Sequence, residues 1–336
     1  MKAWVVSRHG GPEVLLLQPK DRPQAQAGET LVRVEAVGLN HLDLWVRKGV
    51  EGHTFPLPIT PGCDIVGTVE ETGQRVLVNP ILSCGRCEKC KKGFEPLCPQ
   101  FGLIGETTDG GCADIIRVPT GNLLPLPKNI STLDAVCLPI AYVTAWSMLT
   151  RKAKTEKGEW VLIQAGGSGV SVAAIQMAKY LGATVITTVG SPEKAEKARA
   201  LGADHVIQYK TEPFREALKK ILKSNGRKGV DIVIDHVGQE TFSDSMRALD
   251  WGGRLVTCGS TTGPTAQINL QALFFKNLSI LGSTMGAKSD LAVVLNLLEQ
   301  KKIKAVIDRT FDWADLPKAH AYLESRKAFG KVVITR

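Results

Sequence analysis

The sequence predicts a two-domain chain in which a mainly β region is followed by a doubly wound parallel α/β sheet. The first observation is length, because 336 residues are about twice a typical single domain. The second is a change of pattern near residue 160, where short strand-like runs give way to strands that alternate with helices. The third is composition: hydrophobic residues at 43% and charged residues at 22% exclude a disordered, collagen-like or coiled-coil chain.

The first region contains short apolar runs separated by turn residues, and prolines punctuate it. It shows no helix-period stretch long enough to suggest crossover helices between parallel strands. The predicted strands are residues 3–6, 30–37, 64–70, 75–78 and 112–118. We therefore expect a mainly β domain here.

The second region alternates two periodicities, which predicts parallel strands joined by helices that cover both faces of the sheet. The predicted strands are residues 160–163, 184–189, 205–207, 230–234 and 254–258. The predicted helices are residues 170–181, 192–201, 213–222 and 240–249. A further strand at 278–281 and a helix at 290–299 precede a final apolar run at 332–334.

Charge and hydropathy limit the partners. Lys and Arg number 42 against 33 Asp and Glu, and the resulting net charge of +9 favours small anionic ligands. The basic residues are scattered, so no nucleic-acid partner is expected. No membrane partner is expected either, because glycines or Pro139 interrupt the longest uncharged stretches. The first residues lack the apolar core of a signal peptide, which predicts a cytoplasmic protein.

Four of the eight cysteines are bunched between residues 84 and 98, the segment that we call the cysteine lobe. They are Cys84, Cys87, Cys90 and Cys98. This spacing in a reducing compartment is typical of a tetrahedral zinc site, and four thiolates leave no open position for catalysis. The sequence predicts one structural zinc per chain, with unligated thiols or an iron–sulfur cluster as alternatives.

A glycine-rich turn follows the first strand of the α/β region. Its residues are Gly166, Gly167, Ser168, Gly169 and Val170. Glycines at such a turn let the backbone approach a diphosphate, whose charge meets free amides at the helix N-terminus. The fingerprint Gly-x-Gly-x-x-Gly is imperfect here, but the position at the first strand-to-helix turn predicts a dinucleotide-binding site.

The end of the second strand predicts which dinucleotide binds. An acidic residue there would accept a hydrogen bond from the ribose 2′-hydroxyl of NAD, and none is present. The segment offers Gly190, Ser191 and Lys194 instead, and Tyr209 beyond the third strand adds a hydroxyl. NADP(H) is therefore favoured over NAD(H).

Taken together, these residues resemble the medium-chain dehydrogenase/reductase superfamily of zinc alcohol dehydrogenases and quinone oxidoreductases, over essentially the whole chain. The motifs that carry the resemblance are residues 10–15, the cysteine lobe, residues 110–111, 143–145, 173–176 and 330–333. The resemblance implies a GroES-like mainly-β catalytic domain at residues 1–145 and 288–336, and a Rossmann domain at residues 146–287. It also implies an active site in the cleft between them.

The resemblance breaks at the catalytic metal. Family alcohol dehydrogenases use Cys, a His-Glu pair and a second Cys, whereas this chain has Asn40, Cys63-Asp64 and Ile140 at those positions. Three protein ligands are the norm for a catalytic zinc, so we expect a reaction without one. Cys137, His41, Asp43 and His53 are nearby in sequence, which leaves a zinc alcohol dehydrogenase with altered ligands around Cys63 as an alternative.

The remaining site residues are also implied by the resemblance. His41 and Lys331 are expected at the coenzyme, Thr144 near the nicotinamide, and Gly259 and Ser260 near its ribose. Asn40 is expected to donate to a developing oxyanion. Candidate proton carriers are Asp64, Asp43 and His41.

The expected function is hydride transfer between a nicotinamide dinucleotide and a small alcohol, carbonyl, quinone or enone. A non-catalytic nucleotide-binding sensor is the alternative from another functional class. A single-stranded RNA binder is a further alternative, and the scattered positions of the basic residues argue against it. The resemblance further implies a homodimer or homotetramer.

Overall fold

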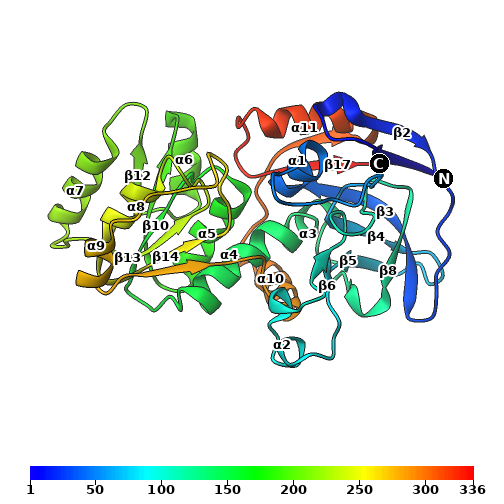
Figure 1. Cartoon of the computed structure of the whole chain (residues 1–336), viewed down its shortest axis with the longest axis horizontal. Coiled ribbons are helices and arrows are strands. Elements are labelled where there is room, and N and C mark those ends of the chain that lie inside the picture. Colours follow the sequence, from blue (N-terminus) through cyan, green and yellow to red (C-terminus); the bar gives the residue numbers. More distant parts are fainter. The chain divides into compact units, whose positions relative to one another are not determined.

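The computed structural model describes all 336 residues, which divide into two compact units. Unit 1 comprises residues 1–143 and 287–336, and unit 2 comprises residues 144–286 (Figure 1). None of the helices combines the length and the hydropathy that crossing a bilayer requires.

Unit 1 is built on a seven-stranded sheet with the order β16-β17-β3-β4-β5-β9, in which β8 also pairs with β3. Its strands are β3 (Glu29–Leu39), β4 (Asp64–Val69), β5 (Arg75–Val78), β8 (Ile115–Pro119), β9 (Leu123–Pro125), β16 (Ile307–Asp312) and β17 (Lys331–Thr335). Two separate strand pairs join β1 (Lys2–Val6) to β2 (Leu15–Pro19) and β6 (Ile81–Leu82) to β7 (Gly102–Leu103). A core of buried aliphatic side chains such as Val34, Ile65 and Val332 packs on this sheet.

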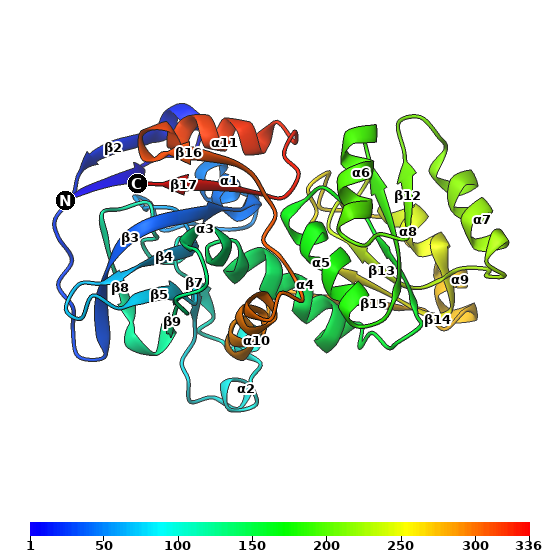
Figure 2. The same cartoon turned by 180° about the vertical axis from the view of Figure 1, so that it is seen from behind.

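The helices of unit 1 are short except for one. They are α1 (His41–Lys48), α2 (Glu88–Lys91), α3 (Thr132–Ala135), α10 (Lys288–Glu299) and α11 (Leu316–Glu324), with a π-helical segment η4 (Leu138–Tyr142). Single 3₁₀ turns are η1 (Pro12–Val14), η2 (Glu95–Leu97), η3 (Thr120–Asn122) and η6 (Trp313–Asp315). The short β17 at the C-terminus lies beside the N-terminal β3 (Figure 2).

Strand register in unit 1 brings distant residues together. The antiparallel pairing of β17 with β3 sets Val332 opposite Leu39, and the pairing of β3 with β4 sets Gly38 opposite Asp64. Position 38 has no room for a side chain, because a Cβ atom there would lie 2.6 Å from the Val136 carbonyl oxygen and 3.1 Å from Asp64 Oδ2. The ends of three strands therefore converge beside the start of α1.

Unit 2 is a six-stranded, fully parallel sheet with the order β12-β11-β10-β13-β14-β15. Its strands are β10 (Trp160–Ile163), β11 (Thr184–Val189), β12 (His205–Gln208), β13 (Val230–Asp235), β14 (Leu249–Thr257) and β15 (Ser279–Gly282). Its helices are α4 (Val143–Ser147), which starts at the unit boundary, α5 (Gly169–Tyr180), α6 (Pro192–Ala200), α7 (Phe214–Ser224), α8 (Phe242–Ala248) and α9 (Leu270–Phe275), with π-helical η5 (Met148–Lys152). Helices α5 and α6 lie on one face of the sheet and α8 on the other (Figures 1 and 2).

This order is that of a doubly wound dinucleotide-binding sheet, so the predicted fold class is confirmed. The predicted helix at 240–249 was too long: Leu249 starts β14, whose Cα partner is Val230 on β13. Helices α1 and α11 are among those not predicted, because each is shorter than ten residues and carries polar residues among its buried positions.

Candidate functional site

The glycine-rich turn links β10 to α5 in unit 2. A Cβ atom at Gly166 would lie 2.4 Å from Thr187 Oγ1 on β11, so only glycine permits this approach. Ser168 caps α5 and accepts a hydrogen bond from the Ser171 amide at 3.0 Å, while Gly169 and Val170 open the helix. The turn follows β10 directly, where the sheet order reverses between β10 and β13, and its helix N-terminus suits a diphosphate.

The residues predicted to select the dinucleotide lie around the end of β11. A Cβ atom at Gly190 would lie 2.8 Å from the Tyr209 hydroxyl oxygen, so these two residues adjoin. Ser191 caps α6 and accepts from the Lys194 amide at 3.3 Å. Tyr209 is half exposed, which leaves the segment open to a ligand.

Three further predicted residues lie in unit 2, two after a strand and one in a helix. Gly259 and Ser260 follow β14, and the backbone of Ser260 packs against Gly238 in the loop after β13. Thr144 is buried in α4, where its hydroxyl donates to the Met285 sulfur at 3.7 Å.

In unit 1, Asn40, Asp64 and Lys331 form a buried cluster that we call the polar network. The Lys331 ammonium donates to Asn40 Oδ1 at 2.6 Å, to Asp64 Oδ2 at 2.8 Å and to the Leu39 carbonyl at 2.8 Å. Asn40 Nδ2 donates to Asp64 Oδ2 at 2.9 Å and to the Gly38 carbonyl at 3.3 Å. All three ammonium hydrogens are satisfied, and the buried charge of Lys331 is balanced by Asp64.

Two other predicted residues begin α1. Asp43 is fully buried, and its carboxylate accepts from the amides of Asn40 at 2.7 Å and Gly62 at 3.0 Å. Burial raises the pKa of Asp43 to about 7. His41 is the first residue of the helix and is half-buried.

At the positions where the resemblance implies a catalytic metal, the side chains of this chain make other contacts. Asp64 Oδ2 is held by Asn40 and Lys331, and Asp64 Oδ1 accepts from the Ile140 amide at 2.8 Å. Burial raises the pKa of the Cys63 thiol well above its usual range and that of Cys137 to about 12. A zinc ligand sulfur must be a thiolate, so a metal at this place would have to displace the proton of a buried thiol.

The cysteine lobe matches a zinc site. The ligand atoms of its four cysteines lie within 4.8 Å of one another, and no other group of three or more His, Cys, Asp or Glu side chains converges in this way. The sulfur of Cys90 lies 3.5 Å from that of Cys87 and 3.9 Å from that of Cys84. Zinc–sulfur bonds of about 2.3 Å in a tetrahedron place sulfurs about 3.8 Å apart, close to these values.

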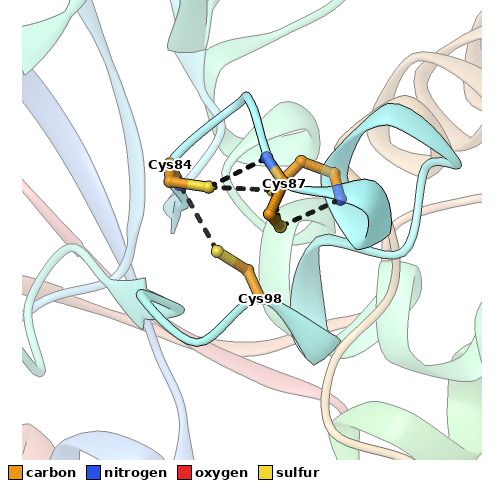
Figure 3. Close-up of side chains that lie close together, drawn as sticks. Cys84, Cys87 and Cys98 are labelled. Carbon is orange, nitrogen blue, oxygen red and sulfur yellow. Dashed lines mark hydrogen bonds between the residues drawn. The ribbon is translucent and has the colours of Figure 1, made fainter.

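Backbone amides point at the sulfurs of the lobe, as Figure 3 shows for three of the cysteines. Cys84 Sγ accepts from the Cys87 amide at 3.3 Å, and Cys98 Sγ accepts from the Cys84 amide at 3.5 Å. Hydrogen bonds from the amides of Arg86 and Cys87 lower the pKa of Cys84 to about 6, whereas burial raises the pKa of Cys90 to about 11. The amides favour the thiolate of Cys84, and the convergence of four sulfurs fits a structural zinc.

The sequence prediction missed two arrangements. Lys331, expected at the coenzyme, bonds Asn40 and Asp64, and only the register of β17 on β3 brings these residues together. His236, which follows Asp235 at the end of β13, contacts the glycine-rich turn through Ser168 and Ser171. A histidine after a strand that ends at the sheet's switch point was the available signal.

Known proteins match this chain along its length. Residues 26–128 match the alcohol dehydrogenase GroES-like domain, and residues 169–300 match the zinc-binding dehydrogenase family. The chain is 31% identical to acryloyl-coenzyme A reductase of Sulfurisphaera tokodaii, over 99% of both proteins. It is 30% identical to quinone oxidoreductase of Mus musculus, over 95% of this chain and 93% of that protein. A crystal structure of an NAD-dependent alcohol dehydrogenase matches at a TM-score of 0.94 and 41% identity, with 100% of both chains covered.

Proposed function

The chain belongs to the medium-chain zinc-containing dehydrogenase/reductase superfamily and is an NAD(P)-dependent oxidoreductase, and we propose that it works without a catalytic zinc. In this proposal it transfers hydride between C4 of a nicotinamide and an alcohol or carbonyl, or an activated alkene such as a quinone or enone. The coenzyme supplies the hydride chemistry. The protein binds and orients the two reactants and excludes water from them.

The polar network is the observation that supports a zinc-free reaction. A catalytic zinc takes three protein ligands, and Asn40 and Ile140 stand where two of them would be. The third candidate, Cys63, is buried, and burial raises the pKa of its thiol. Both carboxylate oxygens of Asp64 already accept hydrogen bonds, from Lys331, Asn40 and the Ile140 amide. The internal ammonium of Lys331 is the cation that this carboxylate binds.

Polar groups assist the transfer in this proposal. Asn40 donates to the reacting oxygen in this proposal, since its Nδ2–H toward the Gly38 carbonyl, at 3.3 Å, makes the weaker of its two bonds and is the one that an approaching oxyanion would share. Thr144 contacts the nicotinamide through its hydroxyl, which otherwise donates to the Met285 sulfur, a weak acceptor. Asp43, with a pKa of about 7, is suited to hold a proton near neutrality, and His41 and Asp64 are the other carriers.

NADP(H) is the proposed coenzyme, with NAD(H) the weaker ligand. The glycine-rich turn, His41, Gly259 and Ser260 hold its common parts, and Gly190, Ser191, Lys194 and Tyr209 surround the 2′-phosphate. The absence of an acid at the end of β11 supports this preference. Lys194→Glu is expected to lower kcat/KM for NADPH about tenfold relative to NADH, the scale of one lost charged hydrogen bond. Lys197→Glu on the same helix is the control, and equal losses in both variants would contradict the preference.

The free edge of the unit 2 sheet supports a homo-oligomer, dimer or tetramer. Strand β15 has no neighbour on its outer side, and large apolar side chains near it are exposed: Trp251 by 59%, Leu270 by 67%, Phe274 by 68% and Phe275 by 66%. An open edge of this kind pairs readily with another chain. Light scattering is expected to give a molecular mass that is a multiple of 36.3 kDa for the wild type and a lower mass for Phe274→Glu. A monomeric wild type would contradict the proposal.

A cytoplasmic location is also proposed, because none of the eight cysteines is in a disulfide and a reducing compartment keeps cysteines reduced. Fractionation of the producing cells tests it, and recovery of the protein outside the cytoplasm would contradict it.

The reaction is tested with protein dialysed against EDTA. NADPH and NADH are each supplied with a quinone, an enone, an aldehyde and, in the oxidised form, an alcohol. Turnover of at least one substrate at an unchanged rate after dialysis is expected. Loss of turnover on dialysis and in Cys63→Ser, with Cys112→Ser unaffected, would instead indicate a zinc alcohol dehydrogenase with altered ligands. Dinucleotide binding without turnover of any substrate would indicate a sensor.

A further inference from the structure

His236 lies at the switch point of the unit 2 sheet. It directly follows β13, and the glycine-rich turn directly follows β10, the neighbouring strand at which the order of the sheet reverses. In doubly wound sheets the ligand crevice opens outside the carboxyl ends of two such strands. Desolvation by the surrounding protein lowers the pKa of His236, which favours the neutral ring.

The hydrogen bonds around the ring determine which nitrogen carries the hydrogen. His236 Nε2 lies 2.8 Å from Ser168 Oγ and 2.9 Å from Ser171 Oγ. Ser171 Oγ donates its only hydrogen to the Gln164 carbonyl oxygen, 2.7 Å away, and a carbonyl can only accept. Ser171 therefore accepts from the imidazole, which places the hydrogen on Nε2, and the two serine oxygens, at nearly equal distances, share that one hydrogen.

This tautomer leaves the hydroxyl hydrogen of Ser168 available. A protonated Nε2 cannot accept, so Ser168 does not donate to the ring. Ser168 Oγ accepts from the Ser171 amide at 3.0 Å, and its own hydrogen has only Ser171 Oγ, also 3.0 Å away, as an acceptor. Since Ser168 caps α5, where helix amides attract anions, a phosphoryl oxygen is the stronger acceptor for that hydrogen.

We propose that His236 is a positioning residue for the coenzyme diphosphate: its Nε2–H holds Ser168 so that the serine hydroxyl donates to a phosphoryl oxygen. The inference rests on the proposed dinucleotide-dependent function and adds a residue from outside the glycine-rich turn. The other tautomer would turn Nε2 into an acceptor and take the Ser168 hydrogen away from the ligand.

The test compares two substitutions at position 236 with a control. His236→Phe removes the donor, and His236→Gln keeps an N–H near the place of Nε2. His205→Phe is the control, because His205 is the other histidine of unit 2 and stacks on Trp160 at 5.5 Å. Dissociation constants are measured for NADPH, NADH, ADP-ribose and adenosine 2′-monophosphate.

His236→Phe is expected to raise the dissociation constants of NADPH, NADH and ADP-ribose about tenfold, which is the scale of one lost hydrogen bond to a charged group. Adenosine 2′-monophosphate, which has no diphosphate, is expected to bind all variants alike, and KM for the second substrate is expected to stay unchanged. His236→Gln is expected to recover most of the affinity. A residue that only supports the fold would give neither the diphosphate selectivity nor the rescue.

The tautomer is read in the wild-type protein from the ring ¹⁵N shifts of labelled histidine. An Nε2–H ring is expected, and an Nδ1–H ring would overturn the inference. Unchanged diphosphate binding in His236→Phe would overturn it too, with the proposed function intact. A wild-type protein that binds neither NADPH nor NADH would overturn the proposed function and this inference together.

Discussion

The cysteine lobe and the polar network both lie in unit 1, and they bind a cation in opposite ways. In the lobe, four sulfurs converge within 4.8 Å, and three of them accept hydrogen bonds from backbone amides at 3.3 to 3.5 Å. In the network, the ammonium of Lys331 already holds Asp64 and Asn40 at 2.8 and 2.6 Å. The lobe therefore fits a metal ion, whereas the network already contains a cation of its own.

The two regions also differ in how the chain assembles them. The lobe comes from one segment of fifteen residues, 84–98, whereas the network joins residues 267 positions apart through strand register. A local cluster tolerates changes elsewhere in the fold, but the network depends on the pairing of β17 with β3. The first two predictions below each break one of these two regions.

Loss of a lobe ligand is expected to have the largest effect. Cys84→Ser removes one of four thiolates, so the chain is expected to lose its zinc and more than about 5 kcal/mol of unfolding free energy. Metal analysis and urea unfolding measure this. Cys137→Ser replaces a buried thiol that bonds only the Leu133 carbonyl and serves as the control. Zinc retained in Cys84→Ser would contradict the assignment of the lobe.

Removal of the internal cation is expected to be the next largest effect. Lys331→Met leaves the Asp64 carboxylate buried without its partner, and breaking such a pair costs about 3–5 kcal/mol. Asp64→Asn in the Lys331→Met background is expected to restore part of this loss, because it removes the unpaired charge. Urea unfolding of the double-mutant cycle measures the coupling, and additive losses would contradict charge balance in the network.

The third prediction concerns Asp43, a buried carboxyl whose pKa makes the stability of the fold depend on pH. Its folded-state pKa is about 7 against an ordinary 3.8, so between these values the folded chain keeps a proton that the unfolded chain releases. The free energy of unfolding attributable to Asp43 therefore falls as pH rises from about 4 to 7, by up to about 4 kcal/mol.

His320 acts in the opposite direction, because burial lowers its pKa to about 3 and its contribution rises with pH. Each group must therefore be removed separately, with Asp43→Asn and with His320→Leu, and the pH profiles compared with wild type by urea unfolding. A wild-type profile unchanged by Asp43→Asn would contradict the buried, protonated carboxyl.

The sequence predicted the parts of the molecule that are local in the chain. The β-α alternation after residue 160, the glycine-rich turn and the cysteine spacing each depend on neighbouring residues. The polar network depends on register, which no short pattern encodes, and the role of Lys331 in it was therefore missed. Helix α11 escaped notice because His320, a polar residue by sequence, occupies one of its buried positions.

The most direct test of the account is the zinc content of the purified wild-type, Cys63→Ser and Cys84→Ser proteins, produced without added metal. The account predicts about one zinc per chain, kept in Cys63→Ser and lost in Cys84→Ser. Two zincs per chain, with one lost together with the activity in Cys63→Ser, would contradict it and would make Cys63 a ligand of a catalytic metal.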